Sequence, residues 1–131
     1  MEIKIMIQKP SVNANKEQIE AFIRSWVKYA CNEGFSAALQ LIDTNTKILW
    51  SDELFDELTF DHYEDGQHCR ITDPSEVKNL RVGVYPYNDG SGFAVDHDLP
   101  LNGKLSDFTA QFDIRRTGEQ LTVILSDIHI L

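Results

Sequence analysis

The chain has 131 residues, 42% of them hydrophobic and 25% charged, which is typical of one globular domain spanning residues 1–131. Its net charge of −9 disfavours nucleic acid and anionic membranes as partners, because phosphate binding needs clustered Lys and Arg. No apolar stretch approaches the length of a membrane span, and the N-terminus does not resemble a signal peptide. Without an export signal, Cys31 and Cys69 are expected to be reduced thiols in a cytoplasmic protein.

The N-terminal half predicts a short strand followed by amphipathic helices. The segment "IKIMI", residues 3–7, alternates as a strand does. Asn15 and Gln18 have the spacing of a capping box, and Gly34 is expected to end the helix that they begin. The apolar positions between them share one helical face: Ile19, Phe22, Ile23, Trp26, Val27 and Ala30. A second, shorter apolar stripe follows over residues 35–42.

Two further helix starts follow along the chain. Ser51 is expected to cap a helix with Asp52 and Glu53 in its first turn, where the helix dipole favours negative charge. The segment "DPSEV", residues 73–77, places a capping Asp73 directly before a proline at the first helical position. It predicts one or two turns of helix.

From residue 81 the pattern changes to strands. Four strand-length runs are separated by turns rich in Gly, Asn and Asp, namely "RVGVYPY", "FAVDHDLPL", "SDFTAQFDIRR" and "LTVILSDIHIL". They predict an antiparallel meander. Because helices come first and strands last, the expected fold class is α+β, with N-terminal helices packed on a curved antiparallel sheet of about four strands.

This order of elements resembles the nuclear-transport-factor-like (cystatin-like) α+β cone superfamily. The closing segment, residues 103–131, is similar to the ends of small uncharacterised bacterial domains of that architecture. The resemblance implies a cone-shaped sheet that encloses a cavity. The superfamily includes isomerases, dehydratases, polyketide cyclases, binding modules and toxin-immunity proteins, so the fold alone does not select a function.

The segment "FDHYEDGQHC", residues 60–69, combines two histidines, three acids and a cysteine. His62 and His68 are six residues apart, which is not the spacing of a helical face, and Gly66 is expected to break any helix between them. The window between Lys47 and Arg70 contains seven acids and neither Lys nor Arg. We therefore expect an acidic surface here, and neither a metal site nor a cofactor.

His97 is the first candidate catalytic residue. Strand alternation places it in an apolar row with Phe93, Val95 and Leu99. The structural interpretation is a histidine that is buried with a satisfied hydrogen bond or partly exposed near the end of the sheet. The functional interpretation is a cavity-lining acid or base that acts near neutral pH.

Asp127 and His129 are the other candidate catalytic residues. If the row that begins at Leu121 continues to the end of the last strand, both side chains face the core, where an aspartate orients an imidazole and raises its basicity. A bulge near Ser126 would instead exchange this row with the row that contains Ile124 and Ile128. A strand end that simply becomes polar is the structural alternative.

Tyr85 and Tyr87 are candidate ligand-binding residues. They share a strand face with Arg81, opposite Val82 and Val84. Their hydroxyls over a concave sheet would bind a small ligand with polar and apolar parts. The alternative is that both are half-buried sheet residues.

Three hypotheses about function follow. The first, which the sequence favours, is a non-catalytic protein-interaction module, of the immunity type for example, whose acidic window binds a basic protein partner. The second is a small-molecule-binding or isomerase/cyclase-like enzyme that holds a small apolar ligand in a cavity between helices and sheet, with His97 as base, Asp127 or His129 as its orienter and Tyr85 as donor. The third is a homodimer that covers the open sheet face. The acidic charge would also serve solubility alone.

Overall fold

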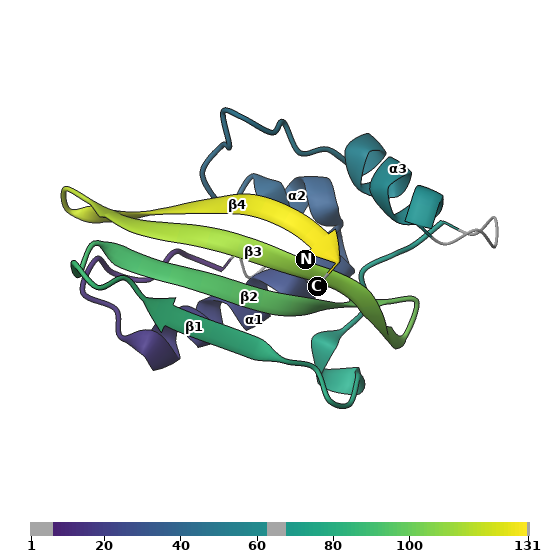
Figure 1. Cartoon of the computed structure of the whole chain (residues 1–131), viewed down its shortest axis with the longest axis horizontal. Coiled ribbons are helices and arrows are strands. Elements are labelled where there is room, and N and C mark those ends of the chain that lie inside the picture. The colour runs from purple at the N-terminus through teal and green to yellow at the C-terminus, as the bar shows by residue number, and fades with distance from the viewer. Residues whose placement is uncertain (1–6, 63–67, 131) are drawn as a thin grey trace, which may run out of the picture.

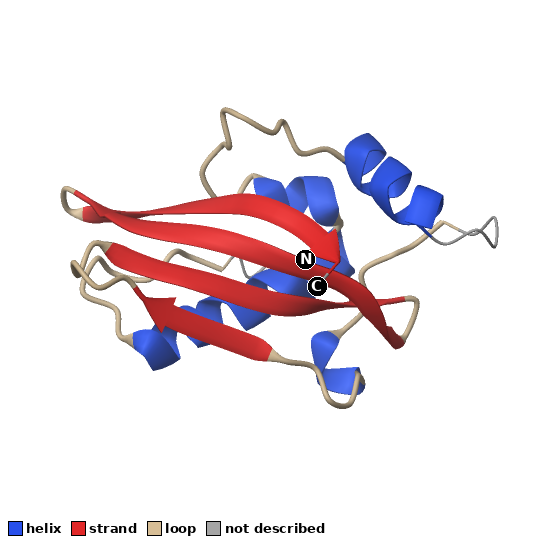
Figure 2. Cartoon of the chain, viewed as in Figure 1, coloured by secondary structure: helices blue, strands red, loops and turns tan. Residues whose placement is uncertain are grey.

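The architecture is one antiparallel sheet with α1 and α2 behind one face and α3 beyond the edge of the sheet (Figures 1 and 2). The computed structural model describes residues 7–62 and 68–130. Four strands lie in the order β1-β2-β3-β4, with bounds β1 (Val82–Pro86), β2 (Gly92–Leu101), β3 (Lys104–Thr117) and β4 (Gln120–Ile130). The predicted α+β class and meander are confirmed. The strand expected over residues 3–7 falls almost wholly outside the described residues.

Helix α1 (Lys16–Glu33) begins and ends where the sequence predicts. The Asn15 side chain accepts a hydrogen bond from the backbone N–H of Gln18 at 2.9 Å, and the Gln18 side chain accepts from the Asn15 N–H at 2.8 Å. Gly34 ends the helix at φ 100°, which a residue with a side chain rarely adopts, and α2 (Phe35–Leu39) begins directly after it. The apolar face predicted for α1 is buried in full.

Side-chain caps also begin the two remaining helical segments. Helix α3 (Asp52–His62) starts after Ser51, whose hydroxyl accepts from the Leu54 N–H at 3.0 Å. The 3-10 turn η1 (Pro74–Glu76) starts after Asp73, whose carboxylate accepts from the Ser75 N–H at 2.9 Å. The expected helix stop at Asp65 and Gly66 lies outside the described residues.

Aromatic packing fills the space between the helices and the sheet. The Trp26 ring meets Phe112 edge-on at 5.3 Å and Phe35 at 6.3 Å between centroids. Its indole N–H donates to the Ala38 carbonyl at 2.7 Å, so the polar atom of this large side chain is satisfied inside the core. The sheet contributes a row of fully or almost fully buried side chains: Val95, Leu99, Phe108, Phe112, Ile114, Val123 and Leu125.

A bulge interrupts the pairing of β3 with β4. Gln111 pairs with Asp127, whereas the next residue, Phe112, pairs with Leu125. Ser126 is therefore one extra residue in β4, and its hydroxyl donates to the Gln111 carbonyl at 3.0 Å. Such a bulge was one of the two arrangements predicted for the last strand, and it exchanges the rows of side chains on the two faces.

A loop segment covers the free edge of β4. Asp43 forms a parallel bridge with Ile124, and its carboxylate accepts from the Val123 N–H at 2.8 Å and from the Lys9 ammonium at 3.0 Å. The Trp50 indole N–H donates to a β4 carbonyl, that of residue 125, at 2.7 Å. These bonds occupy backbone groups that an open edge would otherwise offer to another chain.

Candidate functional site

His97 lies in the core, on the face that strand alternation predicts. It has 0% exposure, its Nδ1 lies 2.6 Å from the Asp98 carbonyl oxygen, and its Nε2 is a buried atom without a hydrogen-bond partner in the described part of the chain. Burial lowers the pKa of His97 to about 4, against the opposing effect of the bond to the Asp98 carbonyl. The imidazole is therefore neutral at pH 7 and isolated from solvent. Its catalytic role stays a prediction, which this environment does not favour.

Asp127 and His129 form a close pair, but on the face opposite His97. His129 Nδ1 lies 3.1 Å from Asp127 Oδ2. The bulge at Ser126 leaves Ile128 on the core face and turns these two side chains outward. This corrects the arrangement in which one of them orients His97, because the sheet itself separates them. A separate role for the outward-facing pair stays a prediction.

Tyr85 and Tyr87 lie on the outer side of the sheet. Tyr85 is 56% exposed, and its ring folds over Gly83, where an added Cβ would come within 2.3 Å of the tyrosine hydroxyl. The Tyr87 hydroxyl donates to Asp113 at 2.7 Å, and the Arg115 guanidinium carbon lies 4.4 Å from the Tyr87 ring centroid. These contacts occupy both the polar tip and one face of Tyr87. Ligand binding by the two tyrosines stays a prediction.

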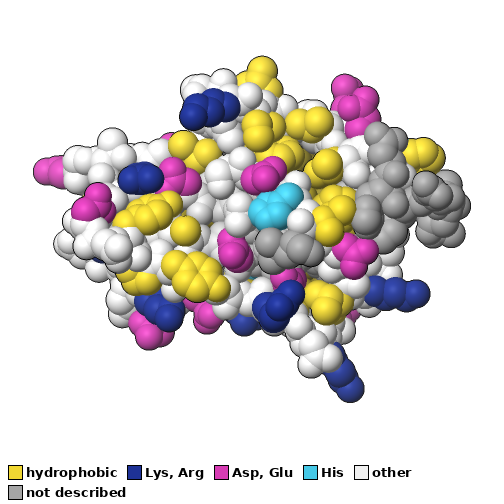
Figure 3. Space-filling view, viewed as in Figure 1, with side chains coloured by type: hydrophobic (Ala, Val, Ile, Leu, Met, Phe, Trp, Pro, Cys, Tyr) yellow, Lys and Arg dark blue, Asp and Glu magenta, His cyan; other side chains and the backbone are white. Residues whose placement is uncertain are grey.

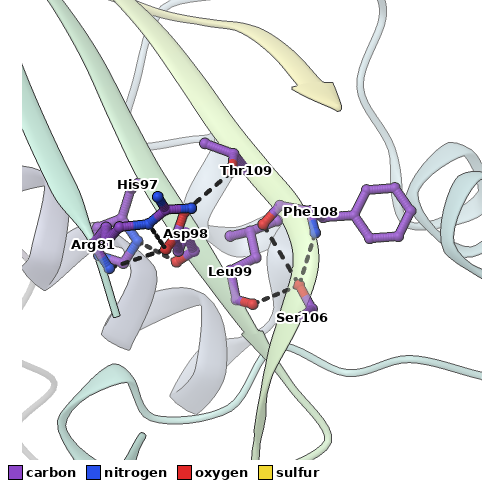
Figure 4. A network of polar contacts seen from close by, with 7 residues as sticks. All are labelled: Arg81, His97, Asp98, Leu99, Ser106, Phe108 and Thr109. Carbon is purple, nitrogen blue, oxygen red and sulfur yellow. Dashed lines mark hydrogen bonds and ion pairs between the residues drawn. The ribbon is translucent and has the colours of Figure 1, made fainter. Parts of the chain in front are cut away.

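A hydrogen-bonded carboxylate of β2 connects the residue before β1 with β3, where β2 departs from regular pairing (Figure 4). Asp98 is 6% exposed, and one of its oxygens accepts from the backbone N–H and the Nε of Arg81 at 3.0 and 3.2 Å. Its other oxygen accepts from the Thr109 hydroxyl at 3.1 Å. Nearby, the Ser106 hydroxyl donates to the Leu99 carbonyl at 2.6 Å. Since its bonds satisfy a buried carboxylate, Asp98 is a structural residue.

The face of the sheet opposite α1 and α2 carries no described helix (Figure 1). The space-filling view shows it as a mosaic of apolar, acidic and basic side chains without one dominant patch (Figure 3). Part of this surface is held by internal bonds, as between Gln111 and Asp96 at 3.0 Å. A homodimer that covers this face stays a prediction.

A pocket of about 450 Å³ lies where α1 ends and where α2 and α3 begin. Its walls come from three segments, residues 30–35, 52–56 and 69–71. Phe35 and Phe55 form an apolar wall, with their ring centroids 5.0 Å apart and their planes at 34°, and Ile71 lies beside them in the lining. We call this the lateral pocket, because it lies at the end of the helical layer.

Acidic groups dominate the charge of the lateral pocket. The carboxylates of Glu33, Asp52 and Asp56 line it together with one base, Arg70. The last turn of α1 carries no basic residue to offset the negative end of its dipole, whereas Asp52 and Glu53 in the first turn of α3 offset the positive end of that helix. Asp52 Oδ1 accepts from the Ser36 N–H at 3.2 Å, which fixes the position of this carboxylate. The pocket therefore favours a cation.

Asp56 has a displaceable partner. Its carboxylate contacts the ring of His68, whose Nδ1 lies 2.5 Å from Asp56 Oδ1. The side chains are 42% and 70% exposed, respectively, and His68 also stacks on Phe60 at 5.2 Å between centroids. His68 thus contacts Asp56 and Phe60 at the surface, while the side chain of His62 lies outside the described residues.

The lateral pocket also contains both cysteines. Burial raises the pKa of the Cys31 thiol, and the carboxylates of Asp73 and Glu76 raise it further, so the thiol is protonated at neutral pH. Among the side chains that the structure describes, which exclude those of residues 61–67, no group of three His, Cys, Asp or Glu could hold a metal ion. The pocket offers walls and charges for binding, and Cys31 is not an activated nucleophile.

The sequence does not indicate the lateral pocket. Asp52 and Asp56 belong to its acidic window, and Phe35 belongs to the second apolar stripe. Nothing in the spacing indicates that residues 30–35, 52–56 and 69–71 meet. The pairing that draws the third segment inward is a bridge between Ile71 and Leu101 at the end of β2.

These observations define an α+β protein with one helical layer on an antiparallel meander and an acidic lateral pocket. A family model described as "Domain of unknown function (DUF7668)" matches residues 10–131, and the chain belongs to this family. Comparison with curated proteins and comparison with solved structures both returned no match. Among the described helices, none has the length and apolar character needed to cross a membrane.

Proposed function

We propose that the protein is a non-catalytic interaction module that binds a basic protein partner at the lateral pocket. The observation that carries the proposal is the composition of that pocket, whose lining combines three acidic residues and one arginine with apolar side chains. Such a surface provides both charge complementarity and apolar contact area. The net charge of −9 adds long-range attraction for a cationic partner.

The finer parts of the proposal follow from the sequence. A toxin-immunity protein is one form of such a module, and the resemblance to the cystatin-like cone superfamily includes that class. A cytoplasmic location agrees with the thiol form of Cys31. The alternative, an isomerase/cyclase-like enzyme, would use the space between helices and sheet, where Trp26 and Phe112 are packed and His97 is fully buried. That environment gives the alternative less support.

The test compares partner retention by the wild-type chain, Asp56→Lys and Glu119→Lys. Glu119 is exposed in the turn between β3 and β4, at the opposite end of the molecule from α3, so its variant makes the same charge change away from the pocket (Figure 1). Immobilised full-length proteins, with folding checked by circular dichroism, are incubated with extract of the native cell at low and high salt. Retained proteins are then identified by mass spectrometry.

The proposal expects one basic protein that wild type and Glu119→Lys retain at low salt and that Asp56→Lys loses. High salt should weaken its retention, because exposed charges are screened. Equal retention by all three proteins, or no salt-dependent partner of the wild-type chain, would refute the proposal.

A further inference from the structure

We infer that the lateral pocket binds a guanidinium group, supplied by an arginine side chain of the partner. The source of the arginine rests on the proposed function. The chemistry of recognition rests on the pocket alone: its size, its aromatic wall and the placement of its carboxylates.

The size and wall of the pocket suit a long side chain with an apolar stem. A volume of about 450 Å³ exceeds that of one side chain and falls within the roughly 300–1,000 Å³ typical of ligand sites. Phe35 and Phe55, which pack on each other and are 6% and 5% exposed, supply the apolar part of its lining together with Ile71. Arginine places its methylene groups against such a surface and stacks its planar head on aromatic rings.

The charges of the pocket select a cation with several donors. Glu33 belongs to the end of α1, whereas Asp52 and Asp56 belong to the first half of α3, so carboxylates approach the space from two elements. A guanidinium has five N–H donors in a plane and can bond acceptors on different sides, whereas an ammonium acts as a compact point charge. An anion would meet three acidic residues in the lining against one arginine, so the charge of the lining disfavours it.

Two side chains of the protein itself, Arg70 and His68, affect how a ligand binds in the lateral pocket. Arg70 lines the pocket and offsets one of the three negative charges. His68 holds Asp56 in an exposed contact that an entering guanidinium would replace with a charge-assisted bond. We therefore assign to Asp56 the main ion pair with the ligand, because Asp52 already accepts from the Ser36 N–H.

The experiment titrates the full-length ¹⁵N-labelled protein with N-acetyl-arginine amide and follows the backbone amide resonances. Saturable shifts are expected within residues 30–35, 52–56 and 69–71, with a dissociation constant on the order of millimolar for one isolated side chain. N-acetyl-lysine amide should bind several-fold more weakly. N-acetyl-citrulline amide, which has the same shape without the charge, should cause no saturable shift.

Two variants locate the contact. Asp56→Asn keeps the shape of the side chain and should weaken arginine binding roughly tenfold. Glu119→Gln removes one charge at the far turn and should leave binding unchanged. Equal binding of the arginine and citrulline probes, shifts spread over the acidic surface without saturation, or an unchanged affinity in Asp56→Asn would each overturn the inference.

The outcomes separate this inference from the proposed function. If the arginine probe binds in the pocket while no protein partner is retained, the interaction module fails and the guanidinium site stands. If a basic partner is retained and lost in Asp56→Lys while the arginine probe causes no pocket shifts, the module stands and the guanidinium site fails.

Discussion

The buried imidazole of His97 should make the unfolding free energy decrease at acidic pH. Replacing His97 with a residue that does not titrate should remove this contribution. Its folded-state pKa is about 4, below the ordinary value of 6.5, because burial penalises the charged form. As pH falls, the unfolded chain therefore takes up the proton before the folded chain does. The stabilisation is fully present above about pH 6.5 and is lost progressively as pH falls toward 4.

The size of this effect follows from the two pKa values. The difference between 6.5 and about 4 corresponds to ~3 kcal/mol of unfolding free energy at about 1.4 kcal/mol per pKa unit. Nearly all of it applies to this group, since His97 has 0% exposure and little solvent screening. Most of the loss, roughly 2 kcal/mol or slightly more, should occur between about pH 7 and pH 4.5.

The assay is urea unfolding of wild type and His97→Leu at neutral pH and at about pH 4.5, followed by tryptophan fluorescence. Carboxylates titrate in both proteins, so the difference between the two pH dependences isolates the histidine. Wild type should lose ~2 kcal/mol more than the variant on acidification. Parallel losses, or an NMR titration of His97 with a pKa near 6.5, would refute the reasoning. His97→Gln serves as a second variant that does not titrate.

Three further predictions concern single groups. Asp98→Ala should reduce the unfolding free energy by ~2–3 kcal/mol, because the Thr109 hydroxyl and the Arg81 backbone N–H lose their acceptor. Arg81→Ala should cost less than about 1 kcal/mol, since that side chain is 80% exposed. Equal losses of unfolding free energy in urea would contradict this difference. Asn15→Ala should cost ~1 kcal/mol by loss of the α1 cap, and an unchanged thermal midpoint would count against the capping box. Cys31 should react slowly with a thiol reagent at neutral pH and faster above pH 9, so rapid neutral labelling would contradict its raised pKa.

Local signals in the sequence determined most of the elements. The capping pair of Asn15 and Gln18, the stop at Gly34 and the cap at Ser51 each act within a few residues, so their effect is visible without tertiary structure. The β2–β3 turn is similar, because Asn102 and its glycine neighbour adopt the positive φ angles of 52° and 79° that this residue pair tolerates. Strand alternation likewise placed His97 on the core face.

Tertiary structure decided which row of β4 side chains faces the core. Both faces of β4 carry apolar residues, so the sequence allowed either row to face the core. Pairing with β3 introduces the extra residue at Ser126, keeps Leu125 and Ile128 buried, and sends Asp127 and His129 to the outer surface. A difference of one residue in register exchanges the two faces, and only the partner strand specifies that register.

The sequence by itself determined the α+β class, the capped starts of α1 and α3, the end of α1 and the acidic composition, because these depend on neighbouring residues and on residue content. It could not determine the lateral pocket, whose walls come from three segments that are separate along the chain, residues 30–35, 52–56 and 69–71. Those segments meet because Phe35 packs against Phe55 and because Ile71 joins the end of β2. Such contacts arise from burying apolar surface between whole elements, and that geometry exists only once the chain has folded.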